Sequence, residues 1–509
     1  YHTMQILMNY FLPHIGENNF KEKAYYLGFM VLKLLKVFKK DEPATDRDSF
    51  KFKRVELSGS LIFDLFKEYY TLQQKHIYQR LDKEYYYKQG IYQNNFPSLF
   101  ENNYLEYFKE RILESGFKKA FKGSWGSQEH THRPEVIQDL NRLSYNSFMS
   151  HLRKLNLPLD SSAKVIGPRL LHSSQWGIID PVDTPDGGNV GLHKHMALGT
   201  HITSGYSSKN LIELLHSVIF VEFLSECNID YISQSTKVFV NGSWIGITNS
   251  PVESLDLLKN FRRLGLIPIF TSISWSIHDN IIYIFSDAGR LCRPCYYVKN
   301  SVPSFHNSKI KDILNSKNFN YYQLLVGFNN FKDSVIENNN YSKFVENNNI
   351  FFTANSLYKT SELSINIKNQ EKMLENQNQI LETLLSKAGI IDYLDTSETE
   401  SSLISINEEN ITKFTTHLEI HPSLLLGIMG NQIVFPENNQ LPRDLFSCGQ
   451  SKQGVSLYHT NYQYRIDKMG VVLNNGQIPL VKSRYLKYIY NEEHPYGINA
   501  IVAIGCYGG

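Results

Sequence analysis

Two histidines of the chain have the spacing of metal ligands. His417 and His421 stand four residues apart. On a helix this spacing places two imidazoles on one face, where they can bind zinc. However, Pro422 follows directly and disfavours a helical His421, and the alternation of polar and apolar residues around the pair favours a strand. The pattern therefore favours a strand over a metal site.

Two cysteines have a spacing that could serve redox chemistry or half of a zinc ribbon. Cys292 and Cys295 form a CRPC motif, but the other cysteines, Cys227, Cys448 and Cys506, lie far from it and supply no second pair. We expect two small buried residues flanking an Arg-Pro turn after a strand. Five cysteines, odd in number and mostly far apart, indicate reduced thiols in an intracellular compartment rather than a disulfide framework.

The remaining candidates for chemistry are basic residues beside turns. No glycine-rich loop is followed by Lys-Ser or Lys-Thr, and no nucleophile elbow is convincing, which argues against P-loop nucleotidases and hydrolases. Residues 141–177 carry one acidic residue, Asp160, among Arg142, His151, Arg153, Lys154, Lys164, Arg169 and His172. Such a stripe is typical of phosphate contacts, although a solvated helix face explains Arg153 and Lys154 equally well. A second basic stretch, 441–454, contains Arg443, Lys452 and Gln453.

Length, composition and charge bound the class of protein. The chain has 509 residues, 42% of them apolar, and a net charge of +2. Its length indicates several domains, and its composition indicates globular structure. The near balance of charge leaves nucleic-acid binding open, because only the local field acts on a phosphate. The most apolar helix candidate, Ala24 to Lys40, is interrupted by Lys33 and Lys36 and falls short of the ~20 apolar residues that span a bilayer.

The elements that must position these residues follow a changing pattern along the chain. Residues 1–120 have helical periodicity, and residues 121–200 are rich in glycine, proline and basic residues, as loops are. Residues 301–380 form an asparagine-rich, variable connector with some helix. Residues 411–509 alternate between apolar and polar, as strands broken by proline do. The pattern predicts an α+β protein with several domains.

Two turns are expected within residues 201–300, which favour β and mixed structure. Asn241-Gly242 lies between two β-rich runs and predicts a two-residue hairpin. The run from Ile281 to Val298 is a second hairpin candidate, with its turn at Ser286 to Gly289.

Eight motifs occur along the chain in a recognisable order. They are TDRDSFKFKR (45–54), KGSWGSQ (122–128), QDLNRLSYNSFMSHLRKLN (138–156), PRLLHSSQWGIIDPVDTPDGGNVGL (168–192), FVNGSWIG (239–246), SDAGRLCRP (286–294), EIHPSLLLG (419–427) and GINAIVAI (497–504). Together they resemble the second-largest (β-like) subunit of multisubunit DNA-directed RNA polymerase in its eukaryotic-type form. The resemblance weakens only across about 301–380. Because the chain starts at Tyr1 without a methionine and stops just after a strand-like run, we expect an internal fragment.

The resemblance implies a division into domains. These are the C-terminal part of the protrusion at 1–130, the fork at 131–200, a first external domain at 201–300, the variable connector at 301–380, a second external domain at 381–410 and the truncated start of the hybrid-binding domain at 411–509. The corresponding structure is a helical protrusion end, a loop-rich fork, mixed α/β external domains and a β-rich start of the hybrid-binding domain.

The resemblance also implies a role for segment 175–192, QWGIIDPVDTPDGGNVGL. The segment is stiff, rich in turns and poor in nucleophiles. In this family it borders the active-centre cleft near the downstream edge of the RNA–DNA hybrid. Its expected work there is to hold its neighbours against the nucleic acid.

Individual site residues are implied by the same resemblance. Lys164 and Arg169 fall in the fork loop that meets template and non-template DNA. Asp186, where the family usually has glutamate, lies close to the site of nucleotide addition, and its shorter side chain puts that contact in doubt. Arg443 matches the arginine that reaches the triphosphate of the incoming nucleotide, a role suited to a forked guanidinium. Lys452 and Gln453 match positions beside the hybrid backbone.

The implied activity is nucleotidyl transfer as part of a complex. Two Mg²⁺ ions would neutralise charge on the attacking and leaving oxygens. The family binds these ions mainly through the largest subunit, so we expect no catalytic residue and no metal ligand in this chain and no activity from it alone. The implied partners are the largest and smaller polymerase subunits, template DNA, the RNA transcript and NTPs, without a membrane.

Two further alternatives concern source and role. The phrases VDTPDGG and LLHSSQWGIIDP are similar to polymerases of large nucleocytoplasmic DNA viruses. This implies a viral factory, the host cytoplasm or the virion as location, whereas a cellular polymerase would act in the nucleus. A nucleic-acid-binding scaffold without catalytic role, from a degenerate or truncated copy, stays open as a second function.

Overall fold

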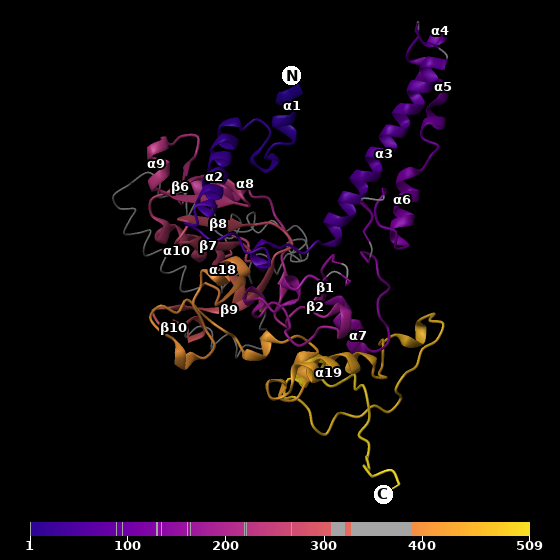
Figure 1. The fold of residues 1–509 in the computed structure, drawn as a ribbon, viewed down its shortest axis with the longest axis vertical. Coiled ribbons are helices and arrows are strands. Elements are labelled where there is room, and N and C mark those ends of the chain that lie inside the picture. The colour runs from indigo at the N-terminus through magenta and orange to yellow at the C-terminus, as the bar shows by residue number, and fades with distance from the viewer. Residues whose placement is uncertain are drawn as a thin grey trace, which may run out of the picture.

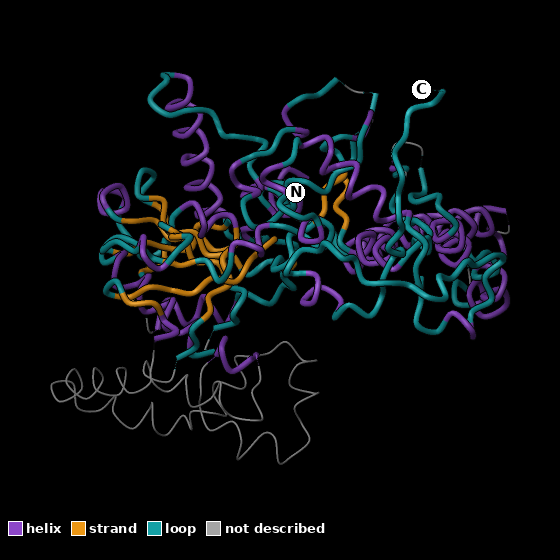
Figure 2. The backbone as a smooth tube through the Cα atoms, turned by 90° about the horizontal axis from the view of Figure 1, so that it is seen from below, coloured by secondary structure: helices purple, strands orange, loops and turns teal. Residues whose placement is uncertain are grey.

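A computed structural model describes residues 2–306, 321–326 and 388–508, apart from positions 88, 94, 129, 130, 134, 160, 163, 218, 220 and 266. Figure 1 shows a helical arm, a region of β-sheets and a C-terminal part with long extended stretches. In Figure 2 the strands gather on one side of the molecule and the helices of the arm lie on the other. Most of the predicted connector, 301–380, falls outside the described residues.

The N-terminal part is helical, as its periodicity predicts. Its helices are α1 (His2–Asn9), α2 (Phe20–Phe38), α3 (Ser58–Tyr87), α4 (Gln89–Tyr92), α5 (Ser98–Tyr107) and α6 (Ile112–Phe121). Helices α3, α5 and α6 form the arm, where Leu65 and Tyr69 of α3 pack with Ala120 of α6. Gly116 is required at this contact, because an added Cβ would lie 2.4 Å from the Tyr69 ring.

A mixed five-stranded sheet carries helices on both faces. Its strand order is β4 (Glu222–Phe223), β6 (Ser243–Thr248), β5 (Thr236–Val240), β8 (Ile281–Phe285) and β7 (Ser272–Ser276). Alternate side chains of β5 and β8 point to opposite faces, as the two-residue period of a strand dictates. One face packs against α8 (Lys209–Ser217) and α10 (Pro251–Arg263), and the other packs against α2.

The hairpin predicted at Asn241-Gly242 is confirmed. Strands β5 and β6 pair antiparallel across it, and the two turn residues have φ of +49° and +83°. Two successive positive φ angles match the right-handed twist of the strands, which is why Asn-Gly favours this turn.

The second predicted hairpin is wrong. Strand β8 pairs with β5 and β7, whereas the next strand, β9 (Leu291–Lys299), pairs with strands of another sheet. The intervening turn is fixed by partners elsewhere in the chain: the Asn241 side chain accepts from the Ser286 amide, and the Val55 amide donates to the Gly289 carbonyl at 2.8 Å. The turn therefore carries the chain from one sheet to the next instead of reversing it.

Strand β9 is the centre of a second, six-stranded sheet. Its partners are β10 (Val302–Pro303), β11 (Ile391–Asp395), β13 (His417–Leu418) and β3 (His201–Ile202), and β12 (Ile404–Ser405) pairs with β13. Cys292 and Cys295 lie within β9 and are buried as predicted, but the Arg-Pro pair between them is part of the strand and not a turn. An unpaired arginine would have to reach solvent, which a turn at the surface allows. Arg293 can instead lie inside the strand, because its guanidinium pairs with the buried carboxylate of Glu419. Burial raises the pKa of the Cys295 thiol to about 12, which makes it a poor nucleophile.

The strand predicted at His417 is confirmed, and the two histidines serve different segments. His417 lies in β13 with its Nε2 atom 3.3 Å from a carboxylate oxygen of Asp392. His421 precedes a 3₁₀ turn and accepts from the Ser423 amide. The pair therefore does not converge on one metal position.

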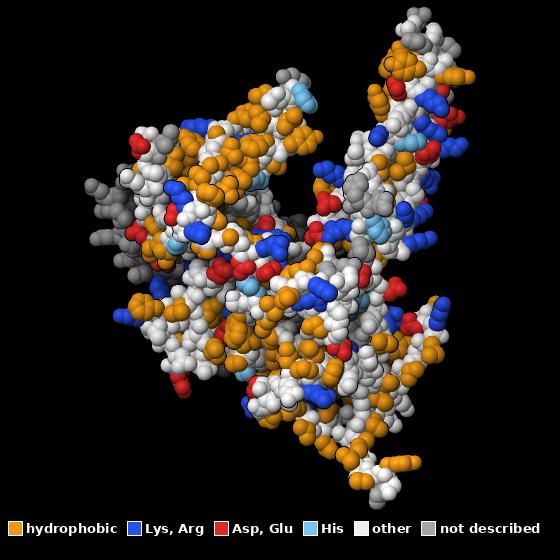
Figure 3. All heavy atoms as spheres, in the orientation of Figure 1, with side chains coloured by type: hydrophobic (Ala, Val, Ile, Leu, Met, Phe, Trp, Pro, Cys, Tyr) orange, Lys and Arg blue, Asp and Glu red, His pale blue; other side chains and the backbone are white. Residues whose placement is uncertain are grey.

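The α+β class with several domains is confirmed, whereas the C-terminal part differs from its expected strands. After Leu418 the described residues form 3₁₀ turns, α19 (Leu441–Gln453), α20 (Leu486–Tyr490) and extended stretches, without a strand. A strand needs a hydrogen-bonded neighbour. Ile501 and Ile504 are almost fully exposed and find none in the described chain, and Figure 3 shows apolar side chains exposed along this tail.

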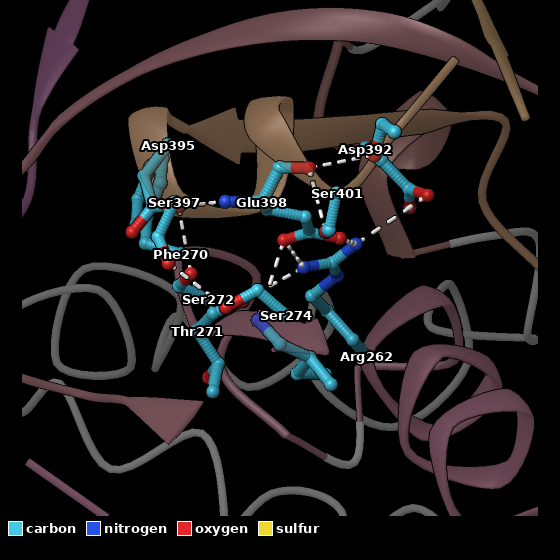
Figure 4. A network of polar contacts seen from close by, with 12 residues as sticks. Arg262, Phe270, Thr271, Ser272, Ser274, Asp392, Asp395, Ser397, Glu398 and Ser401 are labelled. Atoms are coloured by element: carbon cyan, nitrogen blue, oxygen red, sulfur yellow. Dashed lines mark hydrogen bonds and ion pairs between the residues drawn. The ribbon is translucent and has the colours of Figure 1, made fainter. Parts of the chain in front are cut away.

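A buried ionic network joins α10 to the segment that follows β11. Arg262 contacts both oxygens of Glu398, in α18 (Thr396–Glu400), at 2.7 and 2.8 Å (Figure 4). Arg263 pairs with Asp392 in the same way. Burial alone would raise the pKa of Glu398, but the Arg262 guanidinium and, to a smaller extent, Lys259 together hold it below its ordinary value.

We expect Glu398→Gln to destabilise the protein by about 3 kcal/mol, because it removes the bidentate partner of the buried Arg262 charge and leaves it only the longer contact with Asp392 at 3.4 Å. Urea unfolding of the full-length protein, monitored by hydrogen exchange of the amides in α10 and α18, measures this loss of stability. Glu114→Gln is the matched control, since Glu114 forms an exposed pair with Lys118 and should cause no measurable change. Equal, small effects of the two variants would show that the buried network does not hold these segments together.

Candidate nucleic-acid interface

Segment 175–192 is a loop of short turns, and two of its four glycines are required by close neighbours. Gly177 has φ of +68°, and an added Cβ would lie 2.7 Å from the Arg293 side chain. Gly191 has φ of +73°, and an added Cβ would lie 2.3 Å from the Arg169 carbonyl oxygen. Both the backbone angle and the close approach exclude a side chain at these positions. The loop is therefore fixed against two other segments.

Asp180 of this loop joins it to residues about 250 positions later in the chain. Its side chain is 3% exposed and accepts from the amides of Gly427 at 2.8 Å, Gly430 at 3.3 Å and Val182 at 3.1 Å. Burial, with a smaller effect from Asp183, raises the pKa of Asp180 to about 7. The two glycines are needed because the carboxylate occupies the space that their side chains would fill.

Asp183 makes a second connection from the same loop, to the C-terminal end of α19. Its Oδ1 atom lies 2.6 Å from Nζ of Lys452. The backbone oxygen of Lys452 accepts from Oγ of Ser144, which also caps α7 (Tyr145–Leu152). Two contacts, one through the side chain of Lys452 and one through its backbone, thus attach α19 to the loop and to α7.

Helix α19 presents the predicted Arg443 to solvent. Pro442 stands in its first turn, where the missing N–H has no partner to lose, and Asp444 lies near the positive end of the helix dipole. The Arg443 guanidinium lies 5.9 Å from the centre of the Phe446 ring and has no ion pair within the described residues. Gln453 ends the helix and is exposed. Arg443, Lys452 and Gln453 therefore lie on one helix, with Arg443 in its first turn and the other two at its end.

The structure places the two predicted DNA-binding residues differently. Lys164 is exposed. Arg169 donates to the carbonyl oxygens of Gly188 at 2.6 Å, Val190 at 2.9 Å and Ser161 at 3.0 Å. Arg169 thus holds the end of segment 175–192, and its guanidinium is largely used by the protein.

Asp186 lies beside the residues that Arg169 holds. It precedes the 3₁₀ turn Gly187–Asn189, is exposed and makes no capping hydrogen bond with its side chain. Its carboxylate therefore faces solvent next to the loop end. Sequence reasoning missed Asp180 and Asp183, because the Asp180-Pro181 and Pro185-Asp186 steps indicated turns but not which segments the carboxylates of Asp180 and Asp183 would bind.

A solvated helix face does not explain Arg153 and Lys154. Arg153 follows α7, is half-buried and donates to the Ala197 carbonyl at 2.6 Å. Lys154 begins strand β1 (Lys154–Asn156), which pairs with β2 (His193–His195), so it is not on a helix face. Burial lowers the pKa of Lys154. The basic stripe is thus partly internal to the fold.

One group of side chains in the described residues has metal-like spacing. It consists of Glu42, His278 and Asp279. Lys33 donates to both carboxylates, and Lys36 also pairs with Glu42. The ammonium groups already occupy the position that a cation would take. None of the helices in the described ranges is long and apolar enough to cross a membrane.

Comparison with known proteins places three parts of the chain in one family. Residues 138–202 match the model of RNA polymerase Rpb2, domain 3, residues 238–299 match domain 4, and residues 429–509 match domain 6. The chain is 33% identical to DNA-directed RNA polymerase II subunit RPB2 of Encephalitozoon cuniculi over 98% of its length, and 32% identical to subunit 2 of Arabidopsis thaliana over 100%. It is 29% identical to DNA-directed RNA polymerase subunit Rpo2 of Sulfolobus acidocaldarius over 99%. The chain spans 38–39% of the length of these relatives.

We expect Asp180→Ala to lower the free energy of unfolding by at least about 2 kcal/mol, because three buried amides lose their acceptor. Denaturant unfolding of the full-length protein measures the change. Asp186→Ala is the control from the same loop, since its exposed carboxylate should contribute nothing measurable. A loss at position 180 no greater than at position 186 would contradict the role of Asp180 as a connection between segments.

Proposed function

We propose a function for this chain from one premise: it belongs to the Rpb2 family, the second-largest subunits of DNA-directed RNA polymerase. The proposed function is to form part of the active-centre cleft that holds template DNA, the RNA–DNA hybrid and the incoming NTP. The observation that carries it is the attachment of α19, with Arg443 exposed near its start, to segment 175–192 through Asp183. The relatives are polymerase subunits, which favours this function over a scaffold without catalytic role.

In this proposal the chain binds and orients, and the chemistry is completed by a partner. Mg²⁺, bound mainly by the largest subunit, would neutralise charge on the attacking and leaving oxygens. Three carboxylates of this chain are unsuited to binding that ion, because Asp180 is surrounded by amides, Asp183 pairs with Lys452, and Glu42 pairs with lysines. The proposal therefore assigns no metal to this chain, and the chain alone would not extend a primer.

Arg443 and Asp186 are proposed to lie near the NTP. A guanidinium can bind phosphate oxygens through two parallel N–H donors. Arg443 has its guanidinium exposed and unpaired by acids in the described chain, which supports this role. Lys164 is proposed to contact DNA phosphates, and Lys452 and Gln453 to lie beside the hybrid.

The domain division is likewise proposed from the family. The match to domain 3 falls mostly in the proposed fork, 131–200, and the match to domain 4 falls within the proposed first external domain, 201–300. The phrases VDTPDGG and LLHSSQWGIIDP support a large DNA virus as source, with the viral factory, host cytoplasm or virion as location. If the source is instead cellular, the proposed location is the nucleus.

We expect Arg443→Ala in the assembled polymerase to raise the apparent KM for NTPs or slow addition by the equivalent of about 1.5–3 kcal/mol, the usual worth of a hydrogen bond to a charged group. Single-nucleotide addition kinetics measure this effect. Arg443→Lys should recover only part of the loss, because lysine keeps the charge but not the fork. Unchanged kinetics for Arg443→Ala would reject its assigned role and weaken the proposed function.

We expect Lys164→Ala to weaken retention of DNA and to reduce the salt dependence of binding by about one unit of log–log slope, as loss of one phosphate contact does. Binding of labelled duplex across a KCl series measures the slope. Lys413→Ala, at another exposed lysine, should leave it unchanged. Arg169→Ala is a poorer test, because it also removes the hydrogen bonds of Arg169 to the loop carbonyls. A salt-dependence slope that Lys164→Ala leaves unchanged would show that Lys164 does not contact DNA phosphates.

A further inference from the structure

The ammonium group of Lys452 is held by two buried acceptors. Its Nζ atom lies 2.6 Å from Oδ1 of Asp183 and 3.4 Å from Nε2 of His195. The side chains of His195 and Asp183 are 8% and 3% exposed. The Lys452 side chain is 20% exposed. The Lys452 side chain is therefore largely enclosed by the protein but keeps some exposure to solvent.

His195 is fixed in one tautomer. Its Nδ1 atom lies 2.8 Å from the backbone oxygen of Asp183, and a carbonyl oxygen only accepts, so Nδ1 carries the proton. Burial lowers the pKa of His195 to about 4, despite the opposing charge of Asp183, so the ring is neutral near pH 7. Its Nε2 atom therefore presents a lone pair to which Lys452 donates.

This arrangement leaves one donor of Lys452 for a ligand. An ammonium group has three N–H donors, and two of them are directed at Asp183 and His195. A free lysine side chain loses rotamer entropy when it is ordered. Because Lys452 is ordered before any ligand arrives, the third donor can bind an anion without that loss.

The backbone of Lys452 is fixed as well. Ser144 donates to its carbonyl oxygen at 2.6 Å, and the Tyr145 amide donates to Oγ of Ser456 at 3.1 Å. Ser144 and Ser456 are buried. The end of α19 is thus held at its main chain by α7 and at its side chain by Asp183 and His195.

We propose that Asp183 and His195 are positioning residues that direct the free N–H of Lys452 toward a phosphate oxygen of the nucleic acid in the cleft. This inference rests on the proposed function, in which Lys452 lies beside the hybrid backbone. The competing account is that Asp183 neutralises Lys452 and removes it from nucleic-acid binding. The two accounts predict opposite changes in the affinity for nucleic acid when the Asp183 side chain is removed: the first predicts weaker binding, and the second predicts tighter binding.

The test uses polymerase assembled with the full-length subunit and a fluorescent template DNA strand annealed to an RNA primer. Affinity is measured across a KCl series. Lys452→Met should reduce the log–log slope by about one unit, as loss of one phosphate contact does. Asp183→Ala should reduce the slope equally and weaken binding about tenfold, whereas Asp183→Asn, which keeps an oxygen acceptor, should stay within about threefold of wild type. In the Lys452→Met background, Asp183→Ala should have no further effect.

Two controls separate positioning from general stability. His195→Gln keeps an acceptor near the Nε2 position and should bind better than His195→Asn, which keeps only the donor to the Asp183 carbonyl. Val182→Ala creates a cavity next to Asp183, in the cluster with Met429 and Cys448, without touching Lys452, and should leave the slope unchanged.

The outcomes distinguish failure of this inference from failure of the proposed function. Tighter binding or an unchanged slope for Asp183→Ala, with Lys452→Met still reducing the slope, overturns the positioning role and leaves the proposed function intact. The positioning role is also overturned if the Asp183→Asn variant binds the hybrid as weakly as the Asp183→Ala variant. It is overturned as well if Asp183→Ala still lowers the affinity in the Lys452→Met background. An assembled wild-type enzyme that neither binds the hybrid nor extends the primer contradicts the proposed function itself.

Discussion

A carboxylate buried away from water needs hydrogen-bond donors around it, and this requirement shapes the proposed cleft. Asp180 takes its donors from Gly427, Gly430 and its own loop, while Asp183 takes an ammonium group from Lys452. The segments that supply these donors are far apart in the chain, so the two carboxylates bring them together. The stiffness of segment 175–192 thus has a structural role. It keeps one carboxylate in place for Gly427 and Gly430 and another for Lys452 at the end of α19.

The same rule operates in the sheets, with charges instead of amides. Arg262 and Glu398 are fully buried as a bidentate pair, and Arg293 is buried with Glu419. Such pairs are weak sources of net stability, but breaking one leaves an isolated charge in the interior. They therefore favour one arrangement of α10, α18 and β9 over others. Specific polar contacts, added to the apolar cores on both faces of the five-stranded sheet, determine how the parts of this chain are joined.

Sequence reasoning identified local structure, but it failed where contacts with residues far away in the chain determine the conformation. The helical N-terminal part and the Asn241-Gly242 turn follow from periodicity and backbone preference, which are local properties. The turn at Ser286 to Gly289 was assigned to a hairpin because its composition could not show that Val55 and Asn241 hold it between two sheets. For the candidate site, Arg443 is exposed on a helix, as its proposed role requires. The use of Arg169 by loop carbonyls and the partners of Asp180 depend on contacts that no local pattern contains.

The central claim is that segment 175–192 holds the 427–430 segment through the carboxylate of Asp180. Hydrogen exchange of the Gly427 and Gly430 amides in the wild-type protein tests it most directly, because these two groups are the donors. The account predicts exchange as slow as that of amides in the interior strand β8, although Gly427 lies in a loop and Gly430 begins a 3₁₀ turn. Exchange at the rate of exposed loops would contradict it.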